Sequence, residues 1–129
     1  MYPADVRYTK THEWARVEGG MVTIGITSYA SDELSDIVYV ELPNVDDTTE
    51  LGGAFATLES VKAVSEVYAP VAGTVKAANL SLQEEPGLIN EEPYGKGWIA
   101  RMEPIDGSSL DHLMDSEEYE KYVEAERGA

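Results

Sequence analysis

The chain of 129 residues contains no cysteine and few basic residues. The absence of cysteine excludes zinc–thiolate centres, iron–sulfur clusters, redox-active thiols and cysteine nucleophiles. Nine lysines and arginines stand against 25 aspartates and glutamates, which gives a net charge of −16. Because this charge repels phosphate backbones and anionic lipid surfaces, we expect neither nucleic-acid binding nor membrane-surface binding. Contacts with basic patches on protein partners stay open.

Long apolar runs are also missing, and no segment is apolar enough to span a bilayer. Residues 1–5 lack both the basic start of a signal peptide and the arginine-rich pattern of a transit sequence. We therefore expect a cytoplasmic protein. A chain of this length corresponds to one domain that buries roughly two-thirds of its unfolded surface. Because no linker interrupts it, we expect a single domain over residues 1–129.

Short runs rich in β-branched and aromatic residues recur along the chain, bounded by glycine, proline, asparagine or aspartate. Such runs predict strands. They cover residues 21–27, 37–42, 55–59, 64–68, 73–77 and 98–102. Regularly spaced short strands are typical of a mainly β sandwich or barrel.

Helices are expected at two places. Residues 28–34 predict a short helix, and residues from about 107 to 126 predict a C-terminal helical segment in two parts. In the first part, Ser109 would cap a turn with apolar residues on one face, namely Leu110, Leu113 and Met114. The second part would start at Asp115 or Ser116 and present Tyr119, Tyr122 and Val123 on one side.

One lysine stands apart from the other basic residues. Between Arg16 and Lys76 only Lys62 is basic, whereas the same interval holds ten acidic residues. Lys62 also lies between two expected strands, so it should occupy or adjoin a hairpin turn. A lone lysine on a protruding turn is a good acceptor for a modifying enzyme. Spacing alone leaves open a plain surface lysine paired with Glu59 or Glu66.

The residues around this lysine resemble the lipoyl-attachment region of the glycine cleavage H-protein family. The resemblance continues through several ordered blocks over roughly residues 7 to 125. They are Thr11-His12-Glu13-Trp14, Gly25-Ile26-Thr27, Val38 to Pro43, Glu59-Ser60-Val61-Lys62-Ala63, Tyr68 to Gly73, Pro86 to Asn90, Pro93-Tyr94-Gly95 and Gly97-Trp98-Ile99. Ser35-Asp36 departs from the family pattern, which often has glycine before the acid, and this could alter the local turn.

The resemblance implies a barrel-sandwich hybrid of the lipoyl/biotinyl type, with short flanking helices and a C-terminal helical segment. It implies lipoic acid bound through an amide to Lys62. A lipoyl-attaching ligase or transferase would recognise the residues around that lysine, which are Glu59, Ser60, Val61 and Ala63. The protein would be a carrier and not an enzyme, and we expect a monomer.

The resemblance also implies three partners for the carrier arm. A pyridoxal-phosphate glycine decarboxylase releases carbon dioxide and leaves an aminomethyl group on a lipoyl sulfur. A tetrahydrofolate-dependent aminomethyltransferase takes the one-carbon unit and frees ammonia. A dihydrolipoamide dehydrogenase reoxidises the dithiol. An acidic carrier surface can steer docking onto basic rims of such partners.

In this family the loaded arm folds back into a cleft that shields it from water. The matching positions here are Thr11, His12, Glu13 and Glu66. An acid in the cleft could pair with the loaded ammonium, and Glu13 is the first candidate. The alternative is that Glu13 is a solvated strand residue, while Trp14 and Trp98 pack in the core.

Other chemistries fit the sequence less well. His12-Glu13 begins like a zinc-protease motif, but Arg16 stands where the second histidine is required, so we assign no metal. A lipoyl domain of a 2-oxoacid dehydrogenase usually has aspartate before the lysine, and a biotin carrier usually has flanking methionines; Val61 and Ala63 stand there instead. A lipoyl-relay protein, which donates lipoyl groups to other proteins, and an interaction module with unmodified Lys62 remain open.

Overall fold

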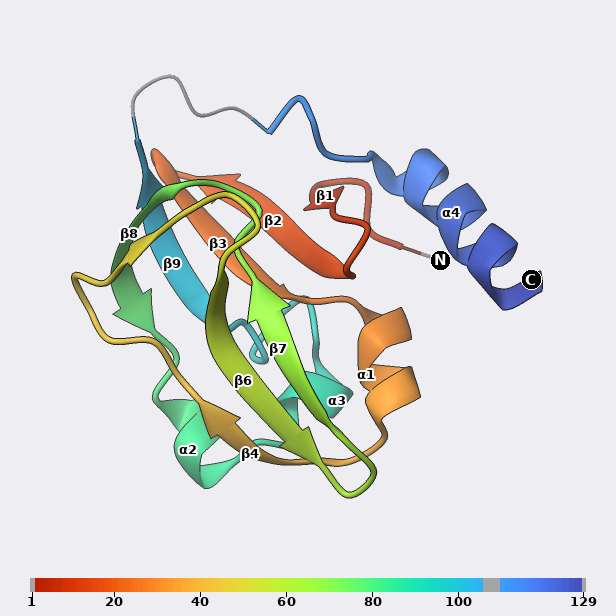
Figure 1. Cartoon of the computed structure of the whole chain (residues 1–129), viewed down its shortest axis with the longest axis horizontal. Coiled ribbons are helices and arrows are strands. Elements are labelled where there is room, and N and C mark those ends of the chain that lie inside the picture. The colour runs from red at the N-terminus through yellow and green to blue at the C-terminus, as the bar shows by residue number, and fades with distance from the viewer. Residues whose placement is uncertain (1, 106–109, 129) are drawn as a thin grey trace.

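The computed structural model describes residues 2–105 and 110–128 (Figure 1). These residues form two antiparallel sheets that are not closed into a barrel. The larger sheet has six strands in the order β1-β2-β3-β9-β8-β5. Their bounds in that order are Arg7–Tyr8, Glu13–Glu18, Met21–Ile26, Ala100–Pro104, Gly73–Ala78 and Thr48–Thr49.

The smaller sheet has three strands in the order β4-β6-β7. They are β4 (Ile37–Glu41), β6 (Ala54–Ser60) and β7 (Val64–Tyr68). The turn between β6 and β7 projects at the lower edge of the view, beside the segment that joins α1 to β4 (Figure 1). This hairpin positions the candidate site, because the lone lysine lies in its turn.

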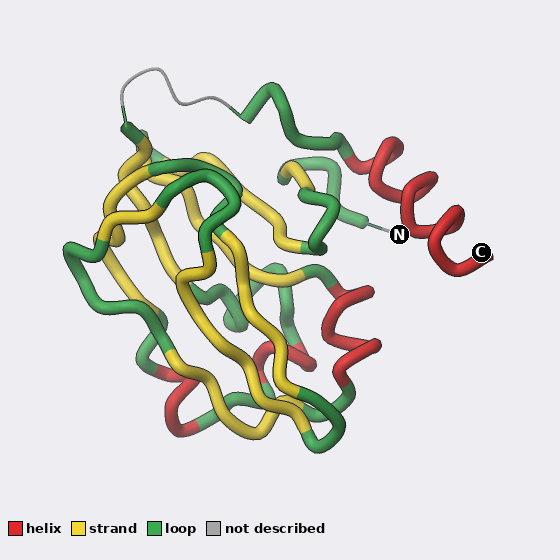
Figure 2. Tube along the Cα trace, in the orientation of Figure 1, coloured by secondary structure: helices red, strands yellow, loops and turns green. Residues whose placement is uncertain are grey.

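Four helices flank the sheets in the described part of the chain: α1 (Ser28–Leu34), α2 (Ser81–Glu84), α3 (Leu88–Glu91) and α4 (Ser116–Gly128). Figure 2 shows α4 at one end of the molecule, next to the N-terminal segment. Its start is a capping box: Glu118 N donates to Asp115 Oδ1 at 2.9 Å, and Asp115 N donates to Glu118 Oε1 at 3.0 Å.

The core has three parts. One lies between the two sheets and the helices α2 and α3, with fully buried residues Leu58, Val67, Leu82, Ile89 and Ile99. A second packs against the inner side of β2, β3, β8 and β9. The third is aromatic and joins α4 to the N-terminal strands, with Tyr8, Trp14 and Tyr119 completely buried. These clusters combine inward-facing strand residues with residues of the helices and of the connecting loops.

The mainly β fold and the six expected strands are confirmed, with shifts of one or two residues at some ends. The helix over residues 28–34 is confirmed, as is the second C-terminal helix with buried Tyr119 and Val123. Trp14 packs in the core, and Trp98 is half-buried against it. The strands β1, β2 and β5 and the helices α2 and α3 were not expected.

The first C-terminal helix is a wrong prediction over residues 110–114. Tyr8 and Met114 exchange backbone hydrogen bonds of 2.9 Å in both directions, which requires extended backbone at Met114. Leu113 is buried against the second core cluster without any helix. Tertiary pairing therefore overrides the helical spacing. Ser109, the expected cap, lies outside the described residues.

Gly25 on β3 makes room for the ring of Trp14 on the neighbouring strand. A Cβ atom at Gly25 would lie 2.7 Å from three atoms of the indole. The ring cannot move freely, because Trp14 Nε1 donates to Pro93 O at 2.9 Å. We expect Gly25→Ala to lower the free energy of unfolding by about 1–3 kcal/mol through overpacking. Urea unfolding measures it, with Gly87→Ala as the matched control because nothing lies within 4 Å there; equal effects would contradict this account.

None of the helices in the described residues is long and apolar enough to cross a membrane.

Candidate functional site

Lys62 lies in an exposed turn that closes the hairpin of β6 and β7. Ser60 N donates to Ala63 O at 2.8 Å, which closes the turn. The hydroxyl oxygen of Ser60 accepts from Lys62 N at 3.1 Å and from Ala63 N at 3.0 Å. The Ser60 side chain therefore stabilises the turn by binding its backbone N–H groups, which explains how the hairpin closes without an Asn-Gly or Asp-Gly pair.

The side chains next to Lys62 are exposed and partly apolar. Val61 is 68% exposed and Val64 is 67% exposed, and Ala63 is exposed as well. Glu59 is exposed on the strand that enters the turn. Lys62 Nζ donates to the backbone oxygen of Glu33 at 3.2 Å, so its partner is neither Glu59 nor Glu66. The amine thus stays at the surface, within reach of a modifying enzyme.

The turn rests on the segment between α1 and β4. Val61 N donates to Asp36 O at 3.0 Å, and Ser60 pairs with Ile37. Ser35 ends α1 with φ 67° and ψ −157°, a backbone region that is essentially restricted to glycine. Ser35, where the chain departs from the family pattern, therefore has a strained backbone. It directly precedes Asp36, whose backbone oxygen binds the lysine turn.

We expect Ser35→Gly to raise the free energy of unfolding by about 1 kcal/mol, because glycine adopts this conformation without steric cost. Chemical denaturation measures the change. Ser81→Gly is the matched control, since Ser81 begins α2 with ordinary helical backbone and glycine there costs roughly 0.5 kcal/mol. Destabilisation by both substitutions would contradict the assignment of strain to Ser35.

A second feature is a buried carboxylate at the start of β2. Glu13 is 1% exposed, so it is not the solvated strand residue of the alternative interpretation. Its Oε1 accepts from Thr9 Oγ1 at 2.6 Å and from Thr11 Oγ1, and its Oε2 accepts from Tyr68 N at 3.1 Å. Glu13 thereby ties the N-terminal loop to the end of β7.

A cavity of about 270 Å³ lies beside this carboxylate. Thr9, Lys10, Thr11 and Glu13 line it from the N-terminal loop. Tyr8 adjoins this loop, and the remaining lining residues come from three other segments: Leu51 and Gly52; Tyr68, Ala69 and Pro70; and His112, Leu113 and Met114. Most of this lining is apolar, and its polar groups include the two threonines, the Glu13 carboxylate, Lys10 and His112. A buried acid at the wall of such a cavity can receive a small cationic group.

Burial raises the pKa of the Glu13 carboxyl, and the hydrogen bonds from Thr11, Thr9 and Tyr68 offset part of this rise. The folded protein therefore binds a proton at Glu13 more tightly than the unfolded chain does. We therefore compare the free energy of unfolding of the wild type with that of Glu13→Gln. The wild-type value should fall relative to the variant as the pH rises from about 4.3, the pKa of glutamate in the unfolded chain, to the raised pKa in the folded protein. Urea unfolding of both proteins between pH 4 and 7 measures this difference. A difference that grows with pH would mean that the hydrogen bonds outweigh burial.

His12 points away from the cavity that Thr11 and Glu13 line. Its backbone has φ 73°, and its ring lies against α4. His12 Nδ1 is 2.7 Å from the hydroxyl of Tyr119, and Nε2 is 3.4 Å from Glu126 Oε1. His12 thus joins the N-terminal loop to α4, and it does not line the cavity.

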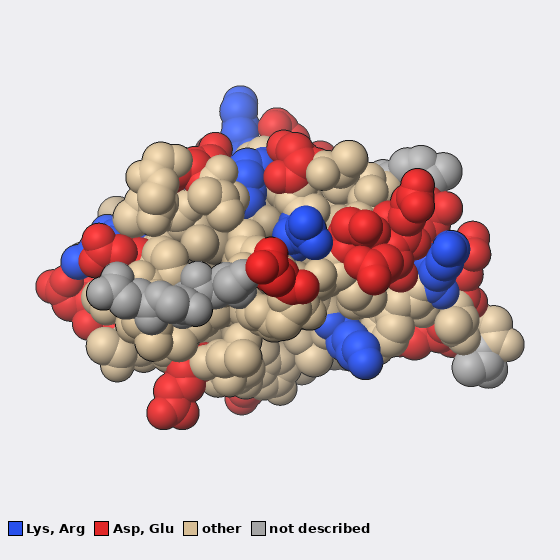
Figure 3. All heavy atoms as spheres, turned by 90° about the horizontal axis from the view of Figure 1, so that it is seen from above, with Lys and Arg blue, Asp and Glu red and all other residues tan. Residues whose placement is uncertain are grey.

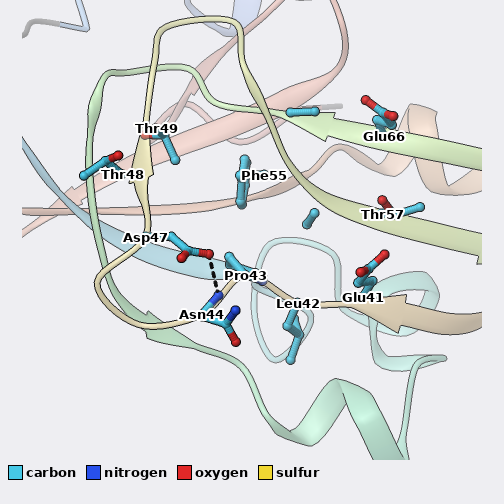
Figure 4. A pocket seen from close by; sticks show the side chains of 12 residues that line it. Glu41, Leu42, Pro43, Asn44, Asp47, Thr48, Thr49, Phe55, Thr57 and Glu66 are labelled. Carbon is cyan, nitrogen blue, oxygen red and sulfur yellow. Dashed lines mark hydrogen bonds between the residues drawn. The ribbon is translucent and has the colours of Figure 1, made fainter.

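Glu66 is also separate from Glu13. It lies exposed on β7, and it lines a different, larger cavity of about 470 Å³ on the outer side of the smaller sheet. Glu66, Thr57 and Glu41 come from neighbouring strands at one side of this cavity, and Asn44 with Asp47 lies at the other side (Figure 4). Of the four expected cleft residues, the structure therefore brings together Thr11 and Glu13 only.

Acidic side chains dominate the surface. On the face drawn in Figure 3 they gather over the end that holds α4, and basic side chains lie singly among them. The described ion pairs that involve lysine or arginine join Arg16 to Asp5 at 3.2 Å and Lys76 to Glu103 at 3.9 Å. Most carboxylates are therefore left to solvent or to a basic partner.

Comparison with known proteins matches this arrangement to one family. The sequence model of the glycine cleavage H-protein covers residues 6–126. The chain belongs to the glycine cleavage H-protein family. It is 53% identical over 124 residues to a glycine cleavage system H protein of Thermus thermophilus, covering 96% of this chain and 97% of the relative. It is 50% identical over 121 residues to that of Staphylococcus saprophyticus, covering 94% and 96%.

The fold agrees with a solved member of the family. The crystal structure of a glycine cleavage system H protein from Mycobacterium marinum superposes with a TM-score of 0.84 at 33% identity, covering 98% of this chain and 99% of that one. This family is the lipoyl carrier of the glycine cleavage system. Membership of this family favours neither the 2-oxoacid dehydrogenase and biotin-carrier alternatives nor lipoyl relay.

Sequence reasoning missed several residues of the candidate site. Thr9 and Tyr68 complete the hydrogen bonds of Glu13, and Asn90 holds the segment under the lysine turn. A threonine two residues before Thr11, within the same loop, was a visible signal for Thr9. The role of Tyr68 rests on its backbone N–H, which no residue type reveals.

Proposed function

We propose that Lys62 carries lipoic acid through an amide, and that the chain is a non-catalytic carrier whose arm serves the enzymes of glycine cleavage. The observation that supports this most is the presentation of a single lysine on an exposed hairpin turn, in a stretch without another basic residue. Among the described residues, no group of three or more His, Cys, Asp or Glu side chains could hold a metal ion. In the proposed role the chemistry is supplied by the partners and by the group on the arm.

The residues present fit a lipoyl group both at its attachment point, Lys62, and at its far end, in the cavity beside Glu13. The exposed ammonium of Lys62 can lose one proton to solvent and then form an amide with an activated lipoate; the activating group leaves, and the second proton lost by the nitrogen goes to that group or to solvent. Acylation removes the lysine charge and with it the charged donor that now meets Glu33 O. When bound, the group would supply a disulfide that is reduced as it accepts the aminomethyl unit, and the dithiol left after transfer of that unit would be reoxidised to the disulfide.

Recognition by the attaching enzyme would use the exposed neighbours of the lysine. Glu59, Val61 and Ala63 present their side chains to solvent, so a ligase or transferase can contact them directly. Ser60 would act differently, because its hydroxyl is occupied by the backbone of the turn. It would shape the turn that the enzyme binds.

We further propose that the cavity beside Glu13 shelters the loaded arm. Tyr68, at the end of β7 opposite to the Lys62 turn, lines the cavity, so the arm would have to lie along this strand to reach it. Glu13 offers a charge without an ion-pair partner in the described chain, and one acceptor position of its carboxylate is unused. A cationic amine could take this position, while the apolar walls exclude water.

The proposed partners are a pyridoxal-phosphate glycine decarboxylase, a tetrahydrofolate-dependent aminomethyltransferase and a dihydrolipoamide dehydrogenase. The acidic surface supports docking onto basic rims around their active-site entrances. A tethered arm then raises the effective concentration of the carried group at each docked site. A monomer in the cytoplasm would serve this exchange best, since every partner must reach the same turn.

The test is a reconstituted exchange reaction. The lipoylated chain is mixed with glycine decarboxylase and glycine, and the incorporation of bicarbonate carbon into glycine is followed. We expect exchange that saturates with the carrier and is absent with the unlipoylated chain. Equal exchange with both forms would refute the proposed carrier role.

A further inference from the structure

The side-chain amide of Asn90 on α3 bridges the backbone on both sides of Asp36. Its Oδ1 accepts from Ile37 N at 2.9 Å, and its Nδ2 donates to Ser35 O at 2.8 Å. These two bonds fix the orientation of the amide, because only the oxygen can accept and only the nitrogen can donate. They also hold the strained backbone at Ser35 in place.

The same segment carries the lysine turn. Between the two groups that Asn90 binds, Asp36 O accepts from Val61 N at 3.0 Å, and Val61 directly precedes Lys62. The lysine amine itself contacts Glu33 O at the end of α1. The backbone contact of Val61 therefore goes to the segment that Asn90 holds, and the lysine amine contacts the end of α1, which leads into that segment.

The helix that bears Asn90 is itself fixed. Ile89 is completely buried in the core between the sheets. Gly97 packs so closely on α3 that a Cβ atom there would lie 2.6 Å from Leu88 O. The position of α3 is therefore fixed, and Asn90 fixes in turn the segment that contacts the turn at Lys62, 28 residues earlier in the sequence. Such support sets the geometry of a reacting group more precisely than a free loop could.

We propose that Asn90 is a positioning residue for Lys62, which holds the turn in the conformation that the lipoyl-attaching enzyme and the carrier's partners receive. The inference rests on the proposed function of Lys62. Without Asn90, Ile37 N and Ser35 O lose their partners and the strained turn relaxes. The turn then samples several conformations, and the attaching enzyme meets the productive one in a smaller fraction of encounters.

The test compares Asn90→Ala with Asn79→Ala. Asn79 is a matched control, because its Nδ2 also donates two bonds to backbone oxygens, at 2.8 Å to Lys96 O and to Trp98 O, away from the lysine turn. Thermal unfolding establishes that each variant is folded at the assay temperature. Asn90→Asp, which keeps an acceptor for Ile37 N, replaces Asn90→Ala if the latter does not fold.

The first readout is amide hydrogen exchange in the unmodified chain. We expect Val61 N–H to exchange about tenfold faster in Asn90→Ala, a factor that corresponds to about 1.4 kcal/mol. Ala69 N–H, which donates to Gly53 O at 2.8 Å at the other end of the hairpin, is the internal reference and should change no more than in Asn79→Ala. Unchanged exchange at Val61 would overturn the proposal.

The second readout is kcat/KM for lipoylation of Lys62 by a lipoyl ligase with lipoate and ATP. We expect a loss of about tenfold in Asn90→Ala and a loss below about twofold in Asn79→Ala. Equal losses in the two variants would reduce Asn90 to a stability residue and overturn the proposal. A wild-type chain that accepts no lipoyl group would refute the proposed function instead. Amide hydrogen exchange at Val61 would still decide whether Asn90 positions the turn.

Discussion

A Lys62→Arg variant should lose all carrier function in glycine cleavage while keeping its fold. The guanidinium stays protonated and forms no stable amide, so no arm can be attached. Because Lys62 is exposed, the substitution removes no buried contact. The free energy of unfolding should therefore change by less than about 0.5 kcal/mol. Bicarbonate exchange into glycine, measured with decarboxylase and the ligase-treated variant, should equal the rate without carrier.

Lys76→Arg is the matched control for this experiment. Lys76 is the next basic residue along the chain, on β8, where it lies 3.9 Å from Glu103 in an exposed ion pair. Its replacement keeps the charge and should leave both lipoylation and exchange at the wild-type level. Exchange that survives in Lys62→Arg would show that the arm is attached elsewhere.

The second large effect is expected at Glu13. If its carboxylate pairs with the ammonium of the loaded arm, Glu13→Gln removes the charge and keeps the size. We expect the loaded chain to break down about tenfold faster, which corresponds to the loss of about 1.4 kcal/mol of shielding. The measurement is the rate at which formaldehyde and ammonium are released from the purified loaded protein in buffer.

Glu66→Gln separates this role from a general effect of negative charge. Glu66 lies exposed on β7 and lines the other cavity, so its neutralisation should leave the lifetime unchanged. A wild-type lifetime in Glu13→Gln would contradict the shielding cavity. Equal shortening in both variants would assign the effect to the acidic surface as a whole.

The sequence predicted those parts of the molecule that depend on local pattern. The strands from Met21, Ile37, Val64 and Gly73 follow from β-branched runs, and α4 follows from the spacing of Tyr119 and Val123. The hairpin turn at Lys62 was predicted because two such runs flank it closely. In each case neighbouring residues determine the element, and tertiary contacts agree with them.

Elements that depend on distant partners were missed. The extended backbone at Met114 exists because Tyr8 pairs with it across the chain, against a helical pattern in residues 110–114. The strands β1 and β5 have only two residues each, too few to show a period. The helices α2 and α3 are single turns held by the core residues Leu82 and Ile89.

The candidate site also has parts that follow from the local sequence and parts that depend on distant contacts. Lys62 and its neighbours lie together because they are consecutive in the sequence. Thr11, His12 and Glu13 are consecutive too, but the positive φ at His12 directs its ring toward α4 and away from the cavity. The bond from Tyr68 N to Glu13 joins residues 55 positions apart, and such a contact becomes visible only in the folded chain.

The central claim is that Lys62 is the lipoylated residue. Intact mass spectrometry with peptide mapping, on protein produced in a host supplied with lipoate, tests it most directly. We expect a mass increase of one lipoyl group, located on the peptide that contains Lys62 and absent from Lys62→Arg. A folded chain without the group in the presence of a competent ligase, or a group on another lysine, would contradict it.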